Sequence, residues 1–295
     1  GKNHIFHSPR MNGDKVEYDW DFRVGAKWAN IIRYRWSEIQ GALMWQEANG
    51  LILPAVRSLV FAQGAFGGPY YPDPDVESTS VDGSVRRLSG SSTFTSIRND
   101  AGTAANDSVG VGANDPRITA GGLDGQWDGM SRAVTLFDAS AIPDTDTISE
   151  ATESIYGSTK SDFFSQSATI VACAPASNTA LAASDYNIAN WDMTVQSDTN
   201  ITIAAWSNTA YNDFPLNATG IAAISKTGIT KFGYVLNADR TNTEPSGTNI
   251  NDNAYINALF AETADTTSDP KLTGTSTGAV AKGGGTMALL LGVGA

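Results

Sequence analysis

Apolar and polar residues alternate along several short stretches of the chain, and a period of two predicts β-strands rather than helices. The stretch KVEYDWDFRVG alternates without interruption, and its apolar positions are Val16, Tyr18, Trp20, Phe22 and Val24. IIRYRW repeats the alternation over residues 31–36. We therefore predict two half-buried strands here, while the stretch that follows, residues 37–61, is compatible with a helix or with a buried strand.

Short strands separated by turn residues are also predicted along the rest of the chain. Pro143 after Ile142 ends one strand, the DTD of residues 144–146 makes a turn, and TISEATESIY begins the next strand. Further short strands are predicted at residues 170–177, 199–206 and 229–236. This succession of strands and turns is typical of a mainly β protein built as a sandwich.

One acidic residue breaks the alternation in the stretch TISEATESIY. Counting in twos places Glu153 on the same side as Ala151 and Ile155, where an apolar residue is expected. Glu153 is either a ligand or an acid in a cleft, or it lies near a sheet edge, at a subunit contact or in a shifted register. A lone carboxylate is weak support for a functional site, so we favour the second interpretation.

Composition divides the chain into parts of different character. Among 295 residues, 41% are hydrophobic and only 17% are charged, which is enough apolar material for a large core. Residues 1–60 carry eight of the 19 Lys and Arg and six acids, so they are +2, and the remainder is 11 − 25 = −14. The Gly- and Pro-rich GAFGGPYYPDPD lies at the change in composition. We predict an attachment or oligomerisation segment over 1–68, a β-sandwich over 69–278 and a C-terminal tail over 279–295.

Four of the seven tryptophans lie in the first segment. They could form a stacking platform for sugars or bases, but tryptophan in a strong period of two is more often packed in a core or a subunit interface. We favour packing, against a second copy or another protein. The predicted interface residues are Val16, Tyr18, Trp20, Phe22, Val24, Trp28 and Trp36.

A longer motif lies in the second part of the chain. The run RAVTLFDASAIPDTDTISEATESIYG resembles the signature of DNRLRE-type (disaggregatase-related) β-sandwich domains, in which an Arg-led strand ends in FD.S.IP and is followed by I..A.L.LY. Supporting segments, among them VESTSVDGSVRR and YNDFPLNATGIAAISKTGITKFGYVL, extend the resemblance over residues 69–278. It implies a jelly-roll sandwich. The family pattern usually has Leu where this chain has Glu153, so the chain departs from the pattern at that position.

The arrangement of these segments is similar to a variant common in virion structural proteins of tailed bacteriophages. The resemblance therefore implies a non-enzymatic virion protein, displayed on the head, tail or a fibre, whose partners are other virion proteins or its own copies and whose sandwich contacts host glycans. Two alternatives stay open: a secreted, extracellular carbohydrate-binding module, and a glycosidase or depolymerase that uses two carboxylates. If the chain did hydrolyse polysaccharide, Glu153 with Asp138 would be the first candidates.

Charge and residue counts exclude several other classes of function. A net charge of −12 argues against nucleic acid as a partner. Both histidines, His4 and His7, lie near the amino end, so the sandwich has no Ser-His-Asp or Cys-His arrangement and no His-rich zinc site. Cys173 is alone and is expected to be a small buried side chain. The only late apolar run, MALLLGV, is too short to span a bilayer. We expect no catalytic residues, no cofactor and no membrane insertion.

Two further sets of residues are weaker candidates for binding. Acidic pairs in turn-like surroundings could contribute to a Ca²⁺ site, although Asp is common in turns for its own backbone hydrogen bonds. Those pairs are Asp73 with Asp75, Asp124 with Asp128, and Asp144 with Asp146. Aromatic residues in or beside loops could stack on sugar rings, although burial is the usual fate of tryptophan. The candidates for glycan binding are Trp127, Trp191 and Tyr211, while for Trp206 we favour burial.

Overall fold

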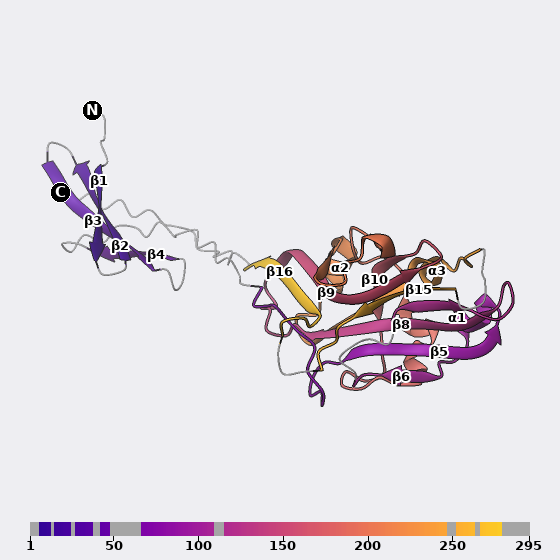
Figure 1. Cartoon of the computed structure of the whole chain (residues 1–295). Helices are drawn as coiled ribbons and strands as arrows, with labels where there is room; N and C mark the ends of the chain where they lie inside the picture. The colour runs from indigo at the N-terminus through magenta and orange to yellow at the C-terminus, as the bar shows by residue number, and fades with distance from the viewer. Residues whose placement is uncertain are drawn as a thin grey trace. The chain divides into compact units, whose positions relative to one another are not determined.

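The computed structural model (Figure 1) describes residues 66–108, 115–246, 252–262 and 266–278, together with the backbone of four strands that precede them. The protein is mainly β, with 44% strand against 14% helix, as the alternating pattern predicts. The chain forms two compact units, one of Gly1–Gln63 with Thr277–Ala295 and one of Gly64–Ser276.

The first unit contains a four-stranded antiparallel sheet in the order β1-β2-β3-β4. Its strands are β1 (Phe6–Asn12), β2 (Lys15–Val24), β3 (Lys27–Ser37) and β4 (Ala42–Glu47). The two predicted strands are thus confirmed, and part of the ambiguous stretch is also a strand. The register pairs Tyr18 with Tyr34 and Tyr34 with Trp45. The side chains of the predicted interface residues, Val16 to Trp36, lie outside the described part of the structure, so that interface stays a prediction.

The second unit is a curled antiparallel sheet of 12 strands, of the β-sandwich and jelly-roll-like class. Its main path runs β11-β10-β14-β8-β7-β15-β9-β13, with β12 paired to β10, β16 to β9, and β5 to both β6 and β8. The strands are β5 (Asp82–Ser92), β6 (Ala104–Asn106), β7 (Arg117–Ala120), β8 (Trp127–Asp138), β9 (Thr147–Asp162), β10 (Ser167–Cys173), β11 (Trp191–Asp192), β12 (Ile201–Thr202), β13 (Tyr211–Pro215), β14 (Ile229–Leu236), β15 (Asn253–Ala258) and β16 (Lys271–Thr277).

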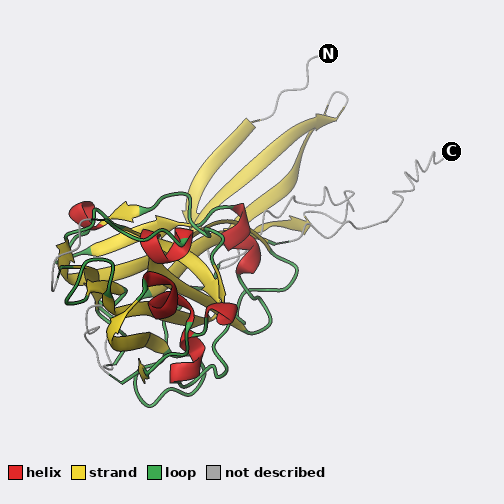
Figure 2. Cartoon of the chain, turned by 90° about the vertical axis from the view of Figure 1, so that its right-hand side faces the viewer, coloured by secondary structure: helices red, strands yellow, loops and turns green. Residues whose placement is uncertain are grey.

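Short helices lie in the connections between these strands (Figure 2). They are α1 (Phe94–Asn99), α2 (Ala218–Ala223) and α3 (Asn237–Thr241), with 3-10 turns η1 (Ala183–Tyr186), η2 (Ile188–Asn190) and η3 (Ile203–Ala205). The strand predicted at residues 199–206 is therefore only Ile201–Thr202. The chain then turns because the side chain of Thr202 accepts a hydrogen bond from the amide of Ala205 and caps η3. The strands predicted near 170 and 229 are confirmed as β10 and β14.

Strand β8 runs through the centre of the second unit. It pairs with β5 on one side and with β14 and β7 on the other, and Figure 1 shows β5 and β8 side by side. Its residues from Gly129 to Phe137 are all buried, so both of its faces are covered. A strand covered on both faces does not alternate between buried and exposed residues. Any polar residue on it is therefore buried.

The core begins earlier than the predicted boundary at residue 69. Phe66 is only 5% exposed and packs edge-to-face on Tyr70, with ring centroids 5.6 Å apart. The hydroxyl of Tyr70 donates to the backbone oxygen of Phe66 at 2.6 Å. The backbone of Tyr70 also forms a β-bridge with Leu272 of β16, so this entry segment is held against the last strand of the sandwich.

Candidate functional site

A group of aromatic side chains lies where β9 meets β13, and we call Tyr71, Tyr156, Tyr211 and Lys271 the tyrosine cluster. Tyr211 pairs directly with Tyr156 in the sheet, and their rings meet edge-to-face with centroids 5.2 Å apart. Lys271 from β16 places its ammonium 3.7 Å from the centre of the Tyr211 ring, a cation–π contact. All three tyrosines are partly exposed, so the cluster is an aromatic surface.

Hydrogen bonds fix the rings of the tyrosine cluster to neighbouring loops. The Tyr156 hydroxyl donates to the backbone oxygen of Thr209 at 2.7 Å, and the Tyr211 hydroxyl donates to those of Thr267 and Asp269 at 3.0 and 3.1 Å. Burial, with added repulsion from Tyr71, raises the pKa of Tyr211 to about 12, so its phenol stays neutral. Held and uncharged rings are a pre-organised surface for stacking. Tyr211, a glycan candidate in the sequence, therefore lies where a ligand can reach it.

The other two glycan candidates are core residues. Trp127 is fully buried between Phe94 and Phe164, in edge-to-face contacts of 5.7 and 5.5 Å, and its indole donates to Glu244 at 2.8 Å. Trp191 is 6% exposed and donates to the backbone oxygen of Asp185 at 2.9 Å. Neither indole offers a face to a sugar ring, which corrects the sequence-based assignment. Two expected burials are confirmed, with Trp206 2% and Cys173 8% exposed.

Two of the acidic residues proposed for Ca²⁺ take part in contacts of the local fold. The backbone oxygens of Asp144 and Asp146 accept hydrogen bonds from the Lys226 ammonium at 2.6 and 2.7 Å, and the Asp146 carboxylate accepts one from Ser276 at 2.8 Å. The Lys226 ammonium thus binds the backbone of this turn. Asp124 lies in the exposed β7–β8 turn, and Asp128 is partly buried on β8. Within the described residues, no three His, Cys, Asp or Glu side chains converge to hold a metal ion.

The remaining acidic pair orders a loop. One carboxylate oxygen of Asp73 accepts hydrogen bonds from the amides and hydroxyls of both Ser78 and Thr79, at 2.6–2.9 Å. These donors outweigh the effect of burial and lower the pKa of Asp73 to about 2. Asp75 is exposed at the same loop.

Glu153 faces the core of the sandwich. Ala151, Glu153 and Ile155 are all buried, as the count in twos requires, and Glu153 has no exposed surface. β9 is paired with both β13 and β16 in this region. The interpretation that we favoured from the sequence, an edge, a contact or a shifted register, is therefore wrong. The Glu153 carboxyl group is buried, and the strand keeps the register that the alternation predicts.

The Glu153 carboxyl has one hydrogen-bond partner in the described part of the chain. The Thr135 hydroxyl from β8 donates to its Oε1 at 2.6 Å, while Oε2 has none. Burial raises the pKa of Glu153 to about 8, against a smaller lowering by Thr135, so the neutral acid is the main form at pH 7. Asp138, its suggested catalytic partner, accepts from the Ser140 amide at 3.0 Å in the following turn.

Other polar groups lie on the same interior face as Glu153. Asp82 pairs with Thr135 in the β5–β8 register and is fully buried, which raises its pKa well above the ordinary value. Tyr234 on β14 is also fully buried, and its hydroxyl has no hydrogen-bond partner among the described residues. Burial first, and then the charges of Asp82, Asp115 and Glu153, raise the pKa of Tyr234. This interior is polar but closed to large substrates.

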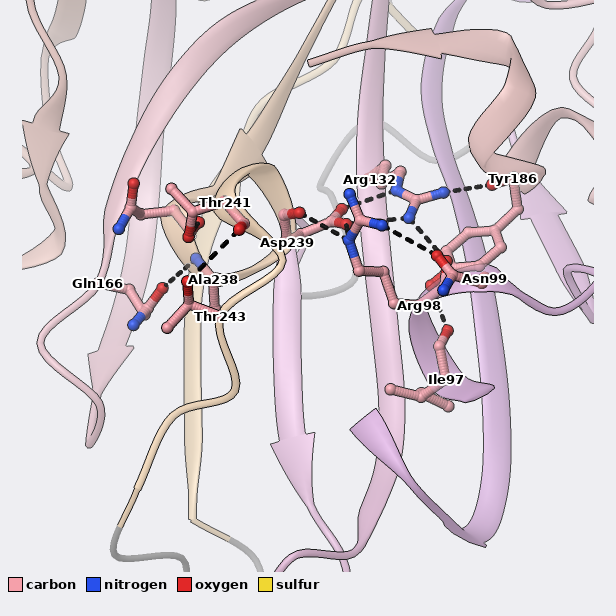
Figure 3. A network of polar contacts seen from close by, with 11 residues as sticks. Ile97, Arg98, Asn99, Arg132, Gln166, Tyr186, Ala238, Asp239, Thr241 and Thr243 are labelled. Carbon is pink, nitrogen blue, oxygen red and sulfur yellow. Dashed lines mark hydrogen bonds and ion pairs between the residues drawn. The ribbon is translucent and has the colours of Figure 1, made fainter. Parts of the chain in front are cut away.

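The opposite face of β8 carries a buried ionic network (Figure 3). Arg132 has no exposed surface and forms a bidentate pair with Asp239 of α3, at 2.7 and 3.0 Å. Its other donors bind the backbone oxygens of Tyr186 and Arg98, and its guanidinium lies 4.2 Å from the centre of the Tyr186 ring. Arg98 of α1 also pairs with Asp239, at 3.2 Å. The network ties α1, α3 and η1 to the central strand.

Sequence reasoning identified Arg132 only as the leading Arg of the family motif and missed its partners. Asp239 and Tyr186 are 107 and 54 residues away in the chain, so no local pattern joins them to Arg132. Tyr156 and Lys271 of the tyrosine cluster were missed for the same reason. The period of two did place Tyr156 on the outer side of β9, which was the available signal.

Comparisons with known proteins add no family assignment. No protein-family model matches the chain, and no curated protein is similar to it in sequence. The resemblance to DNRLRE-type domains therefore remains a prediction from the motif. In the described part of the chain, no helix is long and apolar enough to cross a membrane.

Proposed function

We propose that this protein is a non-enzymatic structural component of a tailed-phage virion, displayed on the head, tail or a fibre. The observation that carries the proposal is the division of the chain into an aromatic-rich sheet and a separate acidic sandwich. An attachment part and a display part are what a surface component of a particle requires. The motif resemblance supports the same class, and localisation to the virion follows from it.

The first unit is the part that joins the protein to other chains. Its register places aromatic residues side by side in neighbouring strands, Tyr18 beside Tyr34 and Tyr34 beside Trp45. A four-stranded sheet is stabilised by packing an apolar face on another surface. We propose self-association or docking on another virion protein, with no nucleic acid and no membrane involved.

The sandwich contacts host glycans through the tyrosine cluster. Partly exposed rings held by hydrogen bonds stack on sugar rings at little cost in conformational entropy. Tyr211 and Tyr156 supply the rings, and Lys271 supplies a donor for sugar oxygens beside them. A secreted carbohydrate-binding module would use the same surface, so this is the alternative that the tyrosine cluster favours.

Catalysis is not part of the proposal. A glycosidase needs two accessible carboxyl groups on either side of the scissile bond. Glu153 is enclosed, and Asp138 caps a turn. Release of reducing ends from host polysaccharide by the purified chain would overturn this part of the proposal.

Low-resolution imaging of assembled particles, decorated with an antibody against residues 69–278, tests the proposed location. Label at regular positions on particles supports the virion component, and label only on soluble secreted material supports the alternative. A glycan array then tests the surface. Tyr211→Ala should lose binding, while Tyr255→Ala, a partly exposed tyrosine on β15, should retain it. Equal binding by both variants would place the glycan site elsewhere.

A further inference from the structure

Three acidic residues lie on the loop of residues 73–80, at the start of β5 and in the segment that follows β15. We call Glu77, Asp82 and Glu262 the acidic latch. One hydrogen bond and two electrostatic interactions connect them. The Asp82 carboxylate accepts a hydrogen bond from the amide of Ala261 at 3.0 Å, next to Glu262. Glu262 is the acid that acts most strongly on Asp82, and Glu77 is the acid that acts most strongly on Glu262.

The oxygen atoms of the acidic latch have few donors. In the described part of the chain, Oε1 of Glu77, both oxygens of Glu262 and Oδ1 of Asp82 are buried without a hydrogen-bond partner. Asp82 is the decisive member, because it has no exposed surface at all. An ionised carboxylate in such a position is strongly disfavoured unless a cation or several donors face it.

No positive charge compensates these groups in the described residues. The ion pairs there join Arg87 to Asp100 and both Arg98 and Arg132 to Asp239, and none includes a member of the acidic latch. The charged neighbours of Glu262 are all acids, namely Glu77, Asp75, Asp107 and Asp269, and those of Glu77 are Asp107, Asp75 and Asp73. No three His, Cys, Asp or Glu side chains among the described residues converge to hold a metal ion. Protonation is the route to neutralising the acidic latch that these residues themselves provide.

The outer acids of this region differ from the inner ones. Asp73 accepts four hydrogen bonds from Ser78 and Thr79, and Asp107 accepts one from the Leu181 amide at 2.7 Å. The donors around Asp73 favour its ionised form. Burial, followed by repulsion from Glu77, instead raises the pKa of Glu262 to about 7, and burial raises the pKa values of Glu77 and Asp82. Burial therefore favours the protonated form of the inner groups, whereas hydrogen bonds favour the ionised form of Asp73.

We propose that the acidic latch is a pH-sensitive device that fastens the segment after β15, residues 259–262, to β5 and to the loop of residues 73–80. In mildly acidic solution a proton held between the inner carboxyl groups keeps them together, because a neutral acid can donate a hydrogen bond to a neighbouring carboxylate. Above neutral pH Glu262 loses its proton, its charge disfavours the arrangement with the other two carboxyl groups, and the segment after β15 detaches from Asp82. This device is independent of the function proposed above.

The size of the effect follows from the proton balance of one group. If Glu262 loses its proton near pH 7 when closed and at its ordinary value of 4.5 when open, opening increases about tenfold between pH 6 and pH 8. Hydrogen exchange of the Ala261 amide reports this opening, because the amide donates its hydrogen bond to Asp82. The Leu259 amide, bonded to Tyr156 at 2.9 Å, serves as an internal reference on the same segment.

Residue-resolved hydrogen exchange of the full chain at pH 6, 7 and 8 tests the acidic latch. The protection factor of Ala261, which is corrected for the intrinsic exchange rate, should fall about tenfold from pH 6 to pH 8 while that of Leu259 changes little. Glu262→Gln should remove the pH dependence, and Glu150→Gln, an exposed residue on β9, should leave it intact. A protection factor that is constant in wild type, or that falls equally in Glu262→Gln, overturns the proposal.

Two further measurements keep the proposal testable if Glu262→Gln does not fold. Carbon-13 NMR of the wild-type carboxyl groups should find Glu262 titrating near pH 7, and titration near 4.5 would overturn the proposal. The exchange series is also repeated with a chelator. Loss of the pH dependence on chelation would mean that a bound divalent ion, not a proton, holds the carboxyl groups together, and would likewise refute the latch as proposed.

Discussion

Replacement of Glu153 by Gln tests the enclosed carboxyl group most directly. The amide has the shape of the acid and can still accept the hydrogen bond from Thr135, which is 2.6 Å long in the wild type, but it cannot ionise. Gln therefore removes the charge without leaving a cavity. The change should stabilise the protein at neutral and alkaline pH and have little effect in acid.

The magnitude follows from the pKa of Glu153, which burial raises from 4.5 to about 8. A carboxyl whose folded-state pKa is raised binds its proton more tightly in the folded than in the unfolded chain. Its contribution to stability is therefore fully present below pH 4.5 and is lost as pH rises toward 8. Each pH unit in that window is worth about 1.4 kcal/mol, so the loss is about 3 kcal/mol at pH 7 and about 5 kcal/mol at pH 8 and above.

Urea unfolding of the full chain at pH 5, 7 and 8.5 measures the effect, with the near-ultraviolet circular dichroism of the sandwich followed as the signal. The free energy of unfolding of Glu153→Gln minus that of wild type should grow by several kcal/mol across this range. Other raised carboxyls, such as Asp82, contribute equally to both proteins and cancel. The control variant Glu150→Gln changes an exposed residue of β9, and its free energy of unfolding should follow that of the wild type at each pH. A difference between Glu153→Gln and wild type that does not change with pH would refute the reasoning.

Three further outcomes follow from the packing. A fragment of residues 64–278 should unfold cooperatively by itself, and one of 69–278 should be less stable by about 3 kcal/mol, as judged by urea titration, because it lacks the buried Phe66. Arg132→Met should cost about 3–5 kcal/mol in the same titration because it leaves the Asp239 carboxylate buried without its main partner, while Arg132→Met combined with Asp239→Asn should recover part of the loss. Replacing Trp20 and Phe22 together by Ser should convert an assembled wild type to smaller species in size-exclusion chromatography, with large single effects of about 2 kcal/mol or more on association. A wild type that is strictly monomeric would contradict the last of these.

Local alternation and turn residues predicted several of the strands. β2 carries its apolar residues at every second position, β3 does so over Ile32, Tyr34 and Trp36, and both appear as strands. Where a residue's surroundings come from distant segments of the chain, the local pattern did not predict them. Trp127 was predicted to lie in or beside a loop because it follows GGLDGQ. In the structure its ring is packed against Phe94, which precedes it in the chain, and Phe164, which follows it. The turn at Asp144 was likewise read without Lys226, which lies 82 residues further on.

The central strand β8 shows why two buried charges in one sandwich have opposite consequences. On one face, Arg132 meets a bidentate carboxylate, two backbone oxygens and an aromatic ring, so its donors are matched. Removing it would leave the buried Asp239 carboxylate with Arg98 as its cationic partner. On the other face, Thr135 offers Glu153 a single hydroxyl, and the acid stays neutral because nothing balances its charge. Burial alone therefore does not decide whether a charged residue stabilises this fold. The number of partners that the opposite layer supplies decides it, and that number depends on segments that a reading of β8 and β9 alone does not include.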